Sequence, residues 1–194
     1  MNPQIGERTD PIINVLHSYS PSDPQEAIDV ERLTGAIAAS DVWSREAALH
    51  ITGSALVLHP ATRRVLLRWH DRLQAWAQVG GHADDGERDP CAIALREATE
   101  ETGLSDLVLW PSAYERAPIQ IVIVRVPARG AEPAHEHADV RYLLGTNRPD
   151  EAVAESKKTP LRWLSLADAL RLTSEGNLQV LLQRAKDRLD EEAR

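Results

Sequence analysis

Three glutamates, Glu97, Glu100 and Glu101, have types and a spacing that suit metal chemistry. Residues three and four positions apart share one face of a helix, so these carboxylates would form a single acidic patch. Like charges at this spacing repel each other by about 0.2–0.5 kcal/mol per exposed pair, and a bound cation would offset that repulsion. Sites with several carboxylate oxygens suit Mg²⁺ or Mn²⁺. The alternative interpretation is a solvated acidic face that binds no ligand.

The helix that must carry these glutamates has clear limits in the sequence. Asp89 followed by Pro90 is typical of an N-cap and a first helical residue, and Gly103 is typical of a left-handed residue at a helix C-terminus. These signals predict about three and a half turns of helix. The face opposite the glutamates is expected to pack into a core, through Cys91, Ala92, Leu95, Ala98 and Thr102.

The loop before this helix adds features that favour the metal interpretation. Gly80 and Gly81 allow the backbone to approach a ligand closely, and the Gly81 carbonyl could face the same cation. Arg96 neighbours the acidic patch, where it could pair with Glu87 and hold the loop against the helix. Together these residues predict a divalent-metal site.

This stretch resembles the Nudix box, the loop–helix signature of the Nudix hydrolase family. The matching residues are Gly81, then Glu87 after five residues, then Arg96-Glu97-Ala98, Glu100-Glu101, Gly103 and Leu104. Eight residues separate Glu87 from Arg96, whereas the family pattern has seven. The extra residue is expected in the turn at Arg88 and Asp89, where an insertion leaves the helical carboxylates in place.

The resemblance extends over about residues 50 to 175 and is similar to one bacterial Nudix subgroup. The matching segments are 50–55, 66–67, Trp76, 80–82, 133–142, 155–156 and 161–163. It implies an α+β fold of the Nudix type, an α/β/α sandwich with a mixed β-sheet between helices.

The activity that the resemblance implies is metal-dependent hydrolysis of a diphosphate bond in a nucleoside diphosphate linked to another moiety. Bound Mg²⁺, with Mn²⁺ as the alternative, would neutralise the phosphate charge and activate a water molecule. The implied metal ligands are Gly81, Glu87, Glu97, Glu100 and Glu101. The implied catalytic residues are Arg96, Glu100 and Glu101, and the alternatives for the general base are Glu101, Glu136 and Glu155.

Several ring-bearing residues are candidates for substrate binding. His135 and His137 share one face of a predicted strand, and Asp139 on that face could orient one imidazole. His82 follows the glycine pair, and Trp76 could stack on a base. The alternatives are exposed histidines at a strand end, loop packing for His82 and core packing for the tryptophan.

Two other functions are open at this point. A Nudix-fold module could bind a nucleotide or an ADP-ribose-like ligand without turnover, although such modules usually lose the box carboxylates. An enzyme resembling isopentenyl-diphosphate isomerase would use a cysteine in a loop. Here the single cysteine, Cys91, lies in the predicted helix on its core face, where a buried and inert thiol is expected.

The segment before the box-containing domain is predicted to be an extension. Residues 1 to about 22 are rich in polar residues and proline, which indicates a loosely ordered arm. Asp23-Pro24 and the apolar spacing that follows predict a helix to about Ser40, and a shorter helix is expected over residues 44–49. We therefore divide the chain into an N-terminal arm and helical extension, 1–49, and a Nudix domain, 50–194.

The rest of the chain mixes strands with a few helices, which indicates an α+β fold. A hairpin is predicted over 51–58 and 65–69, and a third strand over 75–79. Further strands are expected at 107–110, 119–126, 135–144 and 161–164. Ser165 is expected to cap a helix over 166–172, and residues 177–189 form an amphipathic closing helix.

Composition limits the partners. The 194 residues include 22 Lys and Arg against 30 Asp and Glu, so the net charge of −8 argues against binding to nucleic-acid polymers or anionic membranes. The single cysteine cannot form an internal disulfide, and the N-terminus lacks signal-peptide features, so a cytoplasmic location is expected. The expected partners are a small-molecule diphosphate and a second copy of the chain in a homodimer.

Overall fold

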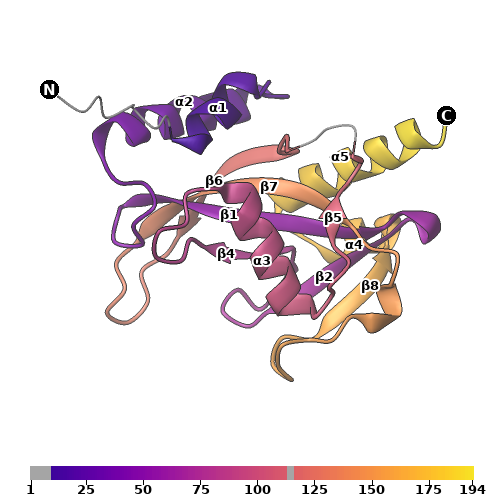
Figure 1. Ribbon diagram of the computed structural model, residues 1–194. Coiled ribbons are helices and arrows are strands. Elements are labelled where there is room, and N and C mark those ends of the chain that lie inside the picture. Colours follow the sequence, from indigo (N-terminus) through magenta and orange to yellow (C-terminus); the bar gives the residue numbers. More distant parts are fainter. Residues whose placement is uncertain (1–9, 113–115) are drawn as a thin grey trace, which may run out of the picture.

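Strand β1 (Leu49–His59) lies at the centre of an eight-stranded mixed sheet (Figure 1). It runs parallel to β7 (His135–Gly145) on one side and antiparallel to β2 (Arg64–His70) and β4 (Val79–His82) on the other. The other strands are β3 (Ala75–Ala77), β5 (Val108–Leu109), β6 (Gln120–Val126) and β8 (Leu161–Ser165). The structure is a computed structural model, and it describes residues 10–112 and 116–194 of the chain.

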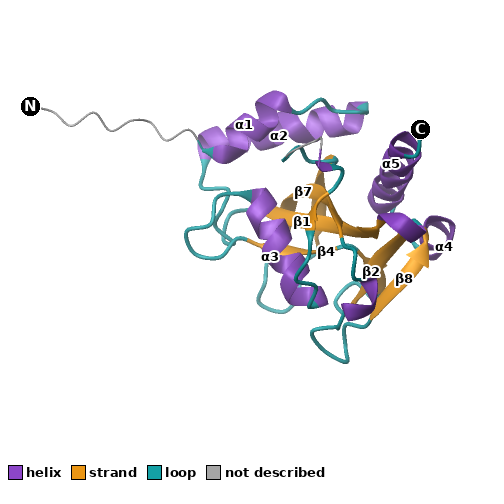
Figure 2. Ribbon diagram, turned by 45° about the vertical axis from the view of Figure 1, so that its right-hand side comes forward, coloured by secondary structure: helices purple, strands orange, loops and turns teal. Residues whose placement is uncertain are grey.

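Helices cover both faces of this sheet (Figure 2). On one face, α3 (Pro90–Thr102) packs against β1 through Ile93 and Ala94. On the other, α4 (Leu166–Leu172) and α5 (Gly176–Glu192) bury leucines against Leu56 and Leu58 of β1. Residues 50–58 are buried because both faces of this strand are covered. The predicted α+β sandwich with a mixed sheet is confirmed.

Most of the predicted elements are confirmed, including the hairpin of β1 and β2 and the strands β5 to β8. The Ser165 hydroxyl accepts a hydrogen bond from the Asp168 N–H at 3.1 Å, as expected of an N-cap. The predicted third strand is split, because its first half pairs with β2 as β3 whereas its second half pairs with β1 as β4. Strand β4 also extends through the two glycines to His82.

The expectation of a loosely ordered arm is wrong for residues 11–18, which form helix α1 (Pro11–Ser18). Asp10 caps this helix by accepting from the Ile12 N–H at 3.3 Å, with proline as the first helical residue. Ile12 and Leu16, one turn apart, are buried in the core shared with α3. Burial of these two side chains stabilises a helix that is too short to be stable alone. Residues 1–9 of the predicted arm lie outside the described residues.

Helix α2 (Pro24–Ala39) matches the predicted helix and packs at the outer edge of β6 (Figure 1). Its Glu26 and Asp29 carboxylates accept hydrogen bonds from the backbone N–H groups of Ile121 and Ile123, at 3.1 and 2.9 Å. An uncovered strand edge would expose these donors to pairing with another chain. The helix therefore protects the sheet edge with two buried carboxylates.

The short helix expected over residues 44–49 is absent, because residues 42–48 form turns and bends and Leu49 begins β1. The Asp41 side chain accepts from the Trp43 N–H, and the Ser44 hydroxyl accepts from the Glu46 N–H, both at 3.3 Å. Such local side-chain bonds compete with helical backbone bonds.

Helix α3 begins and ends where the sequence predicted. The Asp89 carboxylate accepts from the Cys91 and Ala92 N–H groups, and Gly103 has φ = 68°. The predicted core face is partly wrong, because Ala92 and Leu95 are exposed whereas Ile93 and Ala94 are buried. The close approach of α3 to Gly53 of β1 sets this rotation of the helix. Within residues 10–112 and 116–194, no helix has the length and apolar character needed to span a membrane.

Candidate active site

Helix α3 and strand β4 bring Glu97 and Glu101 to the two glycines that precede the box loop. A Cβ atom at residue 81 would lie only 2.4 Å from the carboxyl carbon of Glu97, so this close approach requires Gly81. Glu101 accepts a hydrogen bond from the Gly80 N–H at 3.1 Å. The predicted meeting of glycines and helical carboxylates is therefore present.

These two carboxylates lie in an environment that disfavours their negative charge. The pKa of Glu101 is raised to about 7, mainly by burial. The neighbouring Glu97 and Glu155 also raise it, whereas Arg68 and the Gly80 N–H lower it. Burial also raises the pKa of Glu97, although Arg96 opposes the shift. A divalent cation between these oxygens would supply the missing positive charge.

Arg96 connects the box loop to the box helix. Its guanidinium donates to both carboxylate oxygens of Glu87, at 3.1 and 2.9 Å, in the predicted pairing. It also donates to Glu97 at 3.0 Å and to the backbone carbonyl of His82 at 2.9 Å. This two-pronged pairing with Glu87 fixes the loop against the helix and leaves the acidic patch beside it.

Glu87 and Glu100 are more peripheral than the other box glutamates. Glu87 accepts from the Asp84 N–H at 2.9 Å and from Arg96, and the Arg96 hydrogen bonds hold the pKa of its carboxyl below the usual value. The side chain of Glu100 is 56% exposed and lies 3.1 Å from the Arg96 guanidinium. Glu87 thus fixes the loop in the structure, and Glu100 faces solvent at the edge of the patch.

Sequence reasoning missed Arg68, which projects from β2 toward the box. Its guanidinium lies 3.2 Å from Glu101 and 3.7 Å from Glu155, one of the predicted alternatives for the general base. Glu136, another alternative, instead pairs with Arg32 of α2 and Arg125 of β6, at 2.5 and 3.6 Å. A lone arginine in an apolar strand was the available signal for Arg68.

The three predicted histidines come together with a fourth, His50, that was not predicted as a site residue. Nε2 of His137 lies 3.2 Å from Nε2 of His82 and 3.1 Å from Nε2 of His135. The ring centroid of His50 lies 4.8 Å from that of His137 and 5.1 Å from those of His82 and His135. We call these four residues the histidine cluster. The signal for His50 was its place directly before the predicted first strand, in the segment 50–55 that resembles the Nudix subgroup.

Burial favours the neutral imidazole at three members of the histidine cluster, His50, His82 and His137. It lowers the pKa of His82 to about 4 and that of His137 to about 3, with repulsion from neighbouring histidines as a further cause. Burial also lowers the pKa of His50. The expected contact between Asp139 and an imidazole is not among the hydrogen bonds of the described residues. Asp139 instead accepts from Thr52, Ser54, Gln78 and Arg141.

Trp76 lies on β3, on the sheet face opposite α3. Its ring meets Trp69 edge-on with centroids 5.6 Å apart, and the Arg162 guanidinium lies 5.5 Å from its centroid. With the α4–α5 connection it lines a pocket of about 270 Å³, whose wall includes Gln74, Leu172 and Glu175. The tryptophan is therefore partly packed and partly accessible from this pocket.

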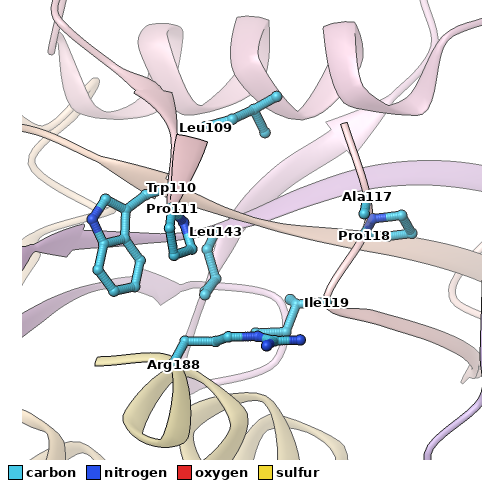
Figure 3. Close-up of a pocket in the computed structure, with 8 residues that line it drawn as sticks. All are labelled: Leu109, Trp110, Pro111, Ala117, Pro118, Ile119, Leu143 and Arg188. Carbon is cyan, nitrogen blue, oxygen red and sulfur yellow. The ribbon is translucent and has the colours of Figure 1, made fainter. Parts of the chain in front are cut away.

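A second, smaller pocket lies away from the box (Figure 3). It has a volume of about 60 Å³ and is lined mainly by apolar residues from the ends of β5 and β7 and from the segment before β6, with Arg188 of α5 at one side. Figure 3 shows Trp110, Pro111 and Pro118 around it, and none of its lining residues belongs to the box or to the histidine cluster.

The thiol of Cys91, the single cysteine of the sequence, is buried as expected, because this residue is only 5% exposed.

Comparisons with known proteins agree with this fold. The family model for the NUDIX domain matches residues 49–185. Among solved structures, the Caenorhabditis elegans Ap4A hydrolase in a binary complex aligns at TM-score 0.57 and 20% identity, over 73% of this chain and 98% of its own. The Escherichia coli dihydroneopterin triphosphate pyrophosphohydrolase aligns at TM-score 0.54 and 18% identity, over 69% and 92%. A NUDIX-family hydrolase from Clostridium perfringens aligns at TM-score 0.51 and 21% identity, over 74% and 97%. No curated protein sequence matches this chain.

Proposed function

Because the chain belongs to the Nudix hydrolase family, we propose that it is a Mg²⁺-dependent pyrophosphohydrolase that cleaves a diphosphate bond in a nucleoside diphosphate linked to another moiety. The observation that carries this proposal is the pair Glu97 and Glu101, held against Gly80 and Gly81 with raised pKa values. A module that only binds its ligand has no need to hold two carboxylates in so unfavourable a setting.

The donor set fits a hard divalent cation. The Gly81 carbonyl and the carboxylates of Glu97, Glu100 and Glu101 would hold Mg²⁺, with Mn²⁺ as the alternative. When bound, the cation neutralises the charge of the phosphates and lowers the pKa of a coordinated water. Glu87 would contribute by positioning the loop, because Arg96 occupies both of its oxygens.

The residues of the chain divide the remaining work. Arg96 keeps the box loop and box helix in register, and Arg68 balances the charge of Glu101. We assign the general base to Glu155, because its side chain is 59% exposed and shares Arg68 with Glu101. Glu136 is less suited to this role, since Arg32 and Arg125 engage its carboxylate.

The substrate is proposed at the level of its phosphates. The names of two structural neighbours give Ap4A and dihydroneopterin triphosphate as the compounds those proteins act on, and these compounds differ in their organic groups. Trp76 lines a pocket on the sheet face opposite α3, so its stacking on the organic group stays a prediction of the sequence. A cytoplasmic location and a homodimer stay predictions of the sequence.

The proposal is tested by phosphate and nucleotide release from a panel of dinucleotides, nucleotide sugars, nucleoside triphosphates and non-nucleotide diphosphates. Wild type is compared with Glu101→Gln and Glu155→Gln, in Mg²⁺ and in chelator. The matched control is Glu151→Gln, which changes an exposed glutamate that pairs with Arg148. Hydrolysis in ¹⁸O-labelled water identifies the phosphorus atom that is attacked.

We expect Mg²⁺-dependent turnover of at least one compound, lost in Glu101→Gln, reduced in Glu155→Gln and kept in Glu151→Gln. Tight binding of a compound without turnover by wild type would overturn the hydrolase proposal in favour of a ligand-binding module. Equal turnover in wild type and Glu155→Gln would remove only the assignment of the base.

A further inference from the structure

We propose that the histidine cluster, His50, His82, His135 and His137, is a second metal site that binds a zinc-type transition-metal dication through the Nε2 atoms. This inference does not depend on the proposed hydrolase activity. It concerns nitrogen ligands, whereas the box supplies oxygen ligands that suit Mg²⁺.

The sheet brings the four imidazoles to one face. In the parallel pairing of β1 and β7, His50 lies opposite His137, and His135 lies two residues earlier on the same face of β7. In the antiparallel pairing of β1 and β4, His82 lies opposite Thr52, two residues from His50. Three neighbouring strands therefore converge on one point, without a loop that must fold onto it.

The separations suit tetrahedral coordination. Zinc–nitrogen bonds of 2.0–2.1 Å at tetrahedral angles place two ligand nitrogens about 3.4 Å apart. The Nε2 atom of His137 lies 3.2 Å from that of His82 and 3.1 Å from that of His135. Ligand atoms of His50, His135 and His137 all lie within 4.8 Å of one another.

Backbone carbonyls fix the orientation of two of these rings. Nδ1 of His50 lies 2.9 Å from the Ala47 carbonyl oxygen, and Nδ1 of His135 lies 3.0 Å from that of Pro133. A carbonyl oxygen only accepts, so each Nδ1 carries the proton and each Nε2 keeps its lone pair. Metal-binding histidines are typically held in this way by a hydrogen bond from the other ring nitrogen.

Hydrogen bonds among the rings do not satisfy these lone pairs. His137 Nε2 carries at most one proton and can donate to His82 or to His135, but not to both. His50 is 2% exposed, and within the described residues its Nε2 has no hydrogen-bond partner. Burying an unpaired polar atom is costly, and a dication at the centre of the cluster would bond to all four lone pairs.

Charged side chains also lie around the cluster. One oxygen of the Glu132 carboxylate lies 3.7 Å from His135 Nε2 and would partly balance a dication, while its other oxygen pairs with Arg72 at 2.8 Å. The positive charge of Arg45 also lowers the pKa of His50. The Arg45 side chain is 60% exposed, however, and lies 3.9 Å from the Asp84 carboxylate. Arg96 already donates to the His82 carbonyl at 2.9 Å. A metal bound to the His82 ring would add a second constraint on β4, the strand that carries Gly81.

The test is metal binding by the full chain without a histidine tag. After treatment with chelator, the protein is titrated with Zn²⁺ and Co²⁺, and metal content and visible absorption are measured. Wild type is compared with His137→Gln, His135→Asn, the box variant Glu101→Gln, and the control His59→Gln. His59 lies at the opposite end of β1, where its Nδ1 lies 2.7 Å from the Thr62 hydroxyl.

We expect one equivalent of zinc in wild type, Glu101→Gln and His59→Gln, and the intense visible bands of tetrahedral Co²⁺. His137→Gln and His135→Asn should each weaken binding by at least about tenfold. If His137→Gln does not fold, His135→Asn at the start of β7 decides. The proposal is overturned if wild type binds neither ion, or if the histidine variants keep the metal and Glu101→Gln loses it.

Discussion

Gly81 and Glu97 are in direct contact, because a Cβ atom at residue 81 would meet all three carboxyl atoms of Glu97 at 2.4–2.7 Å. Gly81→Ala should therefore displace the end of this flexible side chain and leave the fold intact. A ligand shifted by about 1 Å can cost about 10²-fold in rate, and we expect a loss of this size in kcat together with a higher Mg²⁺ requirement.

Steady-state kinetics across a Mg²⁺ titration test this expectation, with thermal melting as the check on the fold. Gly176→Ala is the control, because nothing lies within 4 Å of the added methyl group at the start of α5. Wild-type kinetics in Gly81→Ala would show that the contact with Glu97 has no part in turnover.

Substitution by alanine should change the free energy of unfolding in opposite directions at Gly53 and at Gly35. A Cβ atom at Gly53 would lie 2.4 Å from the Pro90 carbonyl oxygen and 2.9 Å from the Ala94 nitrogen, so α3 would have to move. We expect Gly53→Ala to destabilise the fold by about 2 kcal/mol or more. Gly35 lies within α2 with open space around it, so Gly35→Ala should stabilise by about 0.5–1 kcal/mol.

Urea unfolding of both variants measures these differences in the free energy of unfolding. Equal effects at the two positions would mean that α3 and β1 are not as close as the structure has them. Gly53→Ala should also lower turnover, since the helix that moves carries Glu97 and Glu101.

The box was predictable because its signals are local. The caps at Asp89 and Gly103 and the helical spacing of the glutamates lie within fifteen residues of one another, and the structure has them where expected. The exposed side of α3 was not predictable, because its rotation depends on a glycine in β1 far away in the sequence.

The missed features depend on long-range contacts. Helix α1 has the same local cap signal, Asp10-Pro11, as the box helix, but so short a helix is stable only because Ile12 and Leu16 are buried in the core. His50 lies opposite His137 only because β1 and β7 are parallel neighbours, and Arg68 meets Glu101 only when β2 and α3 are folded together. Strand register and long-range packing place these residues, and the periodicity of a single sequence predicts neither.

Arg96 is a further test of the box geometry. Its planar guanidinium binds both oxygens of Glu87, and it also reaches Glu97 and the His82 carbonyl. Lysine keeps the positive charge but has no fork, so Arg96→Lys should loosen the loop from the helix. We expect about a tenfold to hundredfold loss in kcat/KM.

The control is Arg171→Lys, which changes an exposed arginine of α4 that pairs with Asp168. Kinetics and limited proteolysis of residues 83–88 are compared in the two variants. Full activity in Arg96→Lys would show that charge alone, and not the two-pronged geometry, holds the loop.

The pH dependence of stability should reveal how the N-terminal helices dock. Both terminal nitrogens of Arg184 in α5 donate to the carboxylate of Glu26 in α2, at 2.8 and 2.9 Å. The same carboxylate accepts a hydrogen bond from the Ile121 N–H. Burial would raise the pKa of Glu26, but the hydrogen bonds from Arg184, the Ser22 N–H and Tyr19 outweigh it and lower the pKa below 4.5.

Because the folded state lowers this pKa, the ionised carboxylate stabilises the fold above pH 4.5, and this contribution is lost as the pH falls through the folded-state pKa. Glu26→Gln should cost about 3 kcal/mol at neutral pH, since it leaves the partly buried Arg184 with only the more distant carboxylate of Asp23, at 3.4 Å. The variant should also lose stability less steeply than wild type between about pH 5 and about pH 3.

The exposed Glu31 of the same helix provides the control, Glu31→Gln, whose urea midpoints should follow wild type at every pH. Parallel pH profiles for wild type and Glu26→Gln would mean that the ion pair with Arg184 contributes nothing to holding α2 on the sheet.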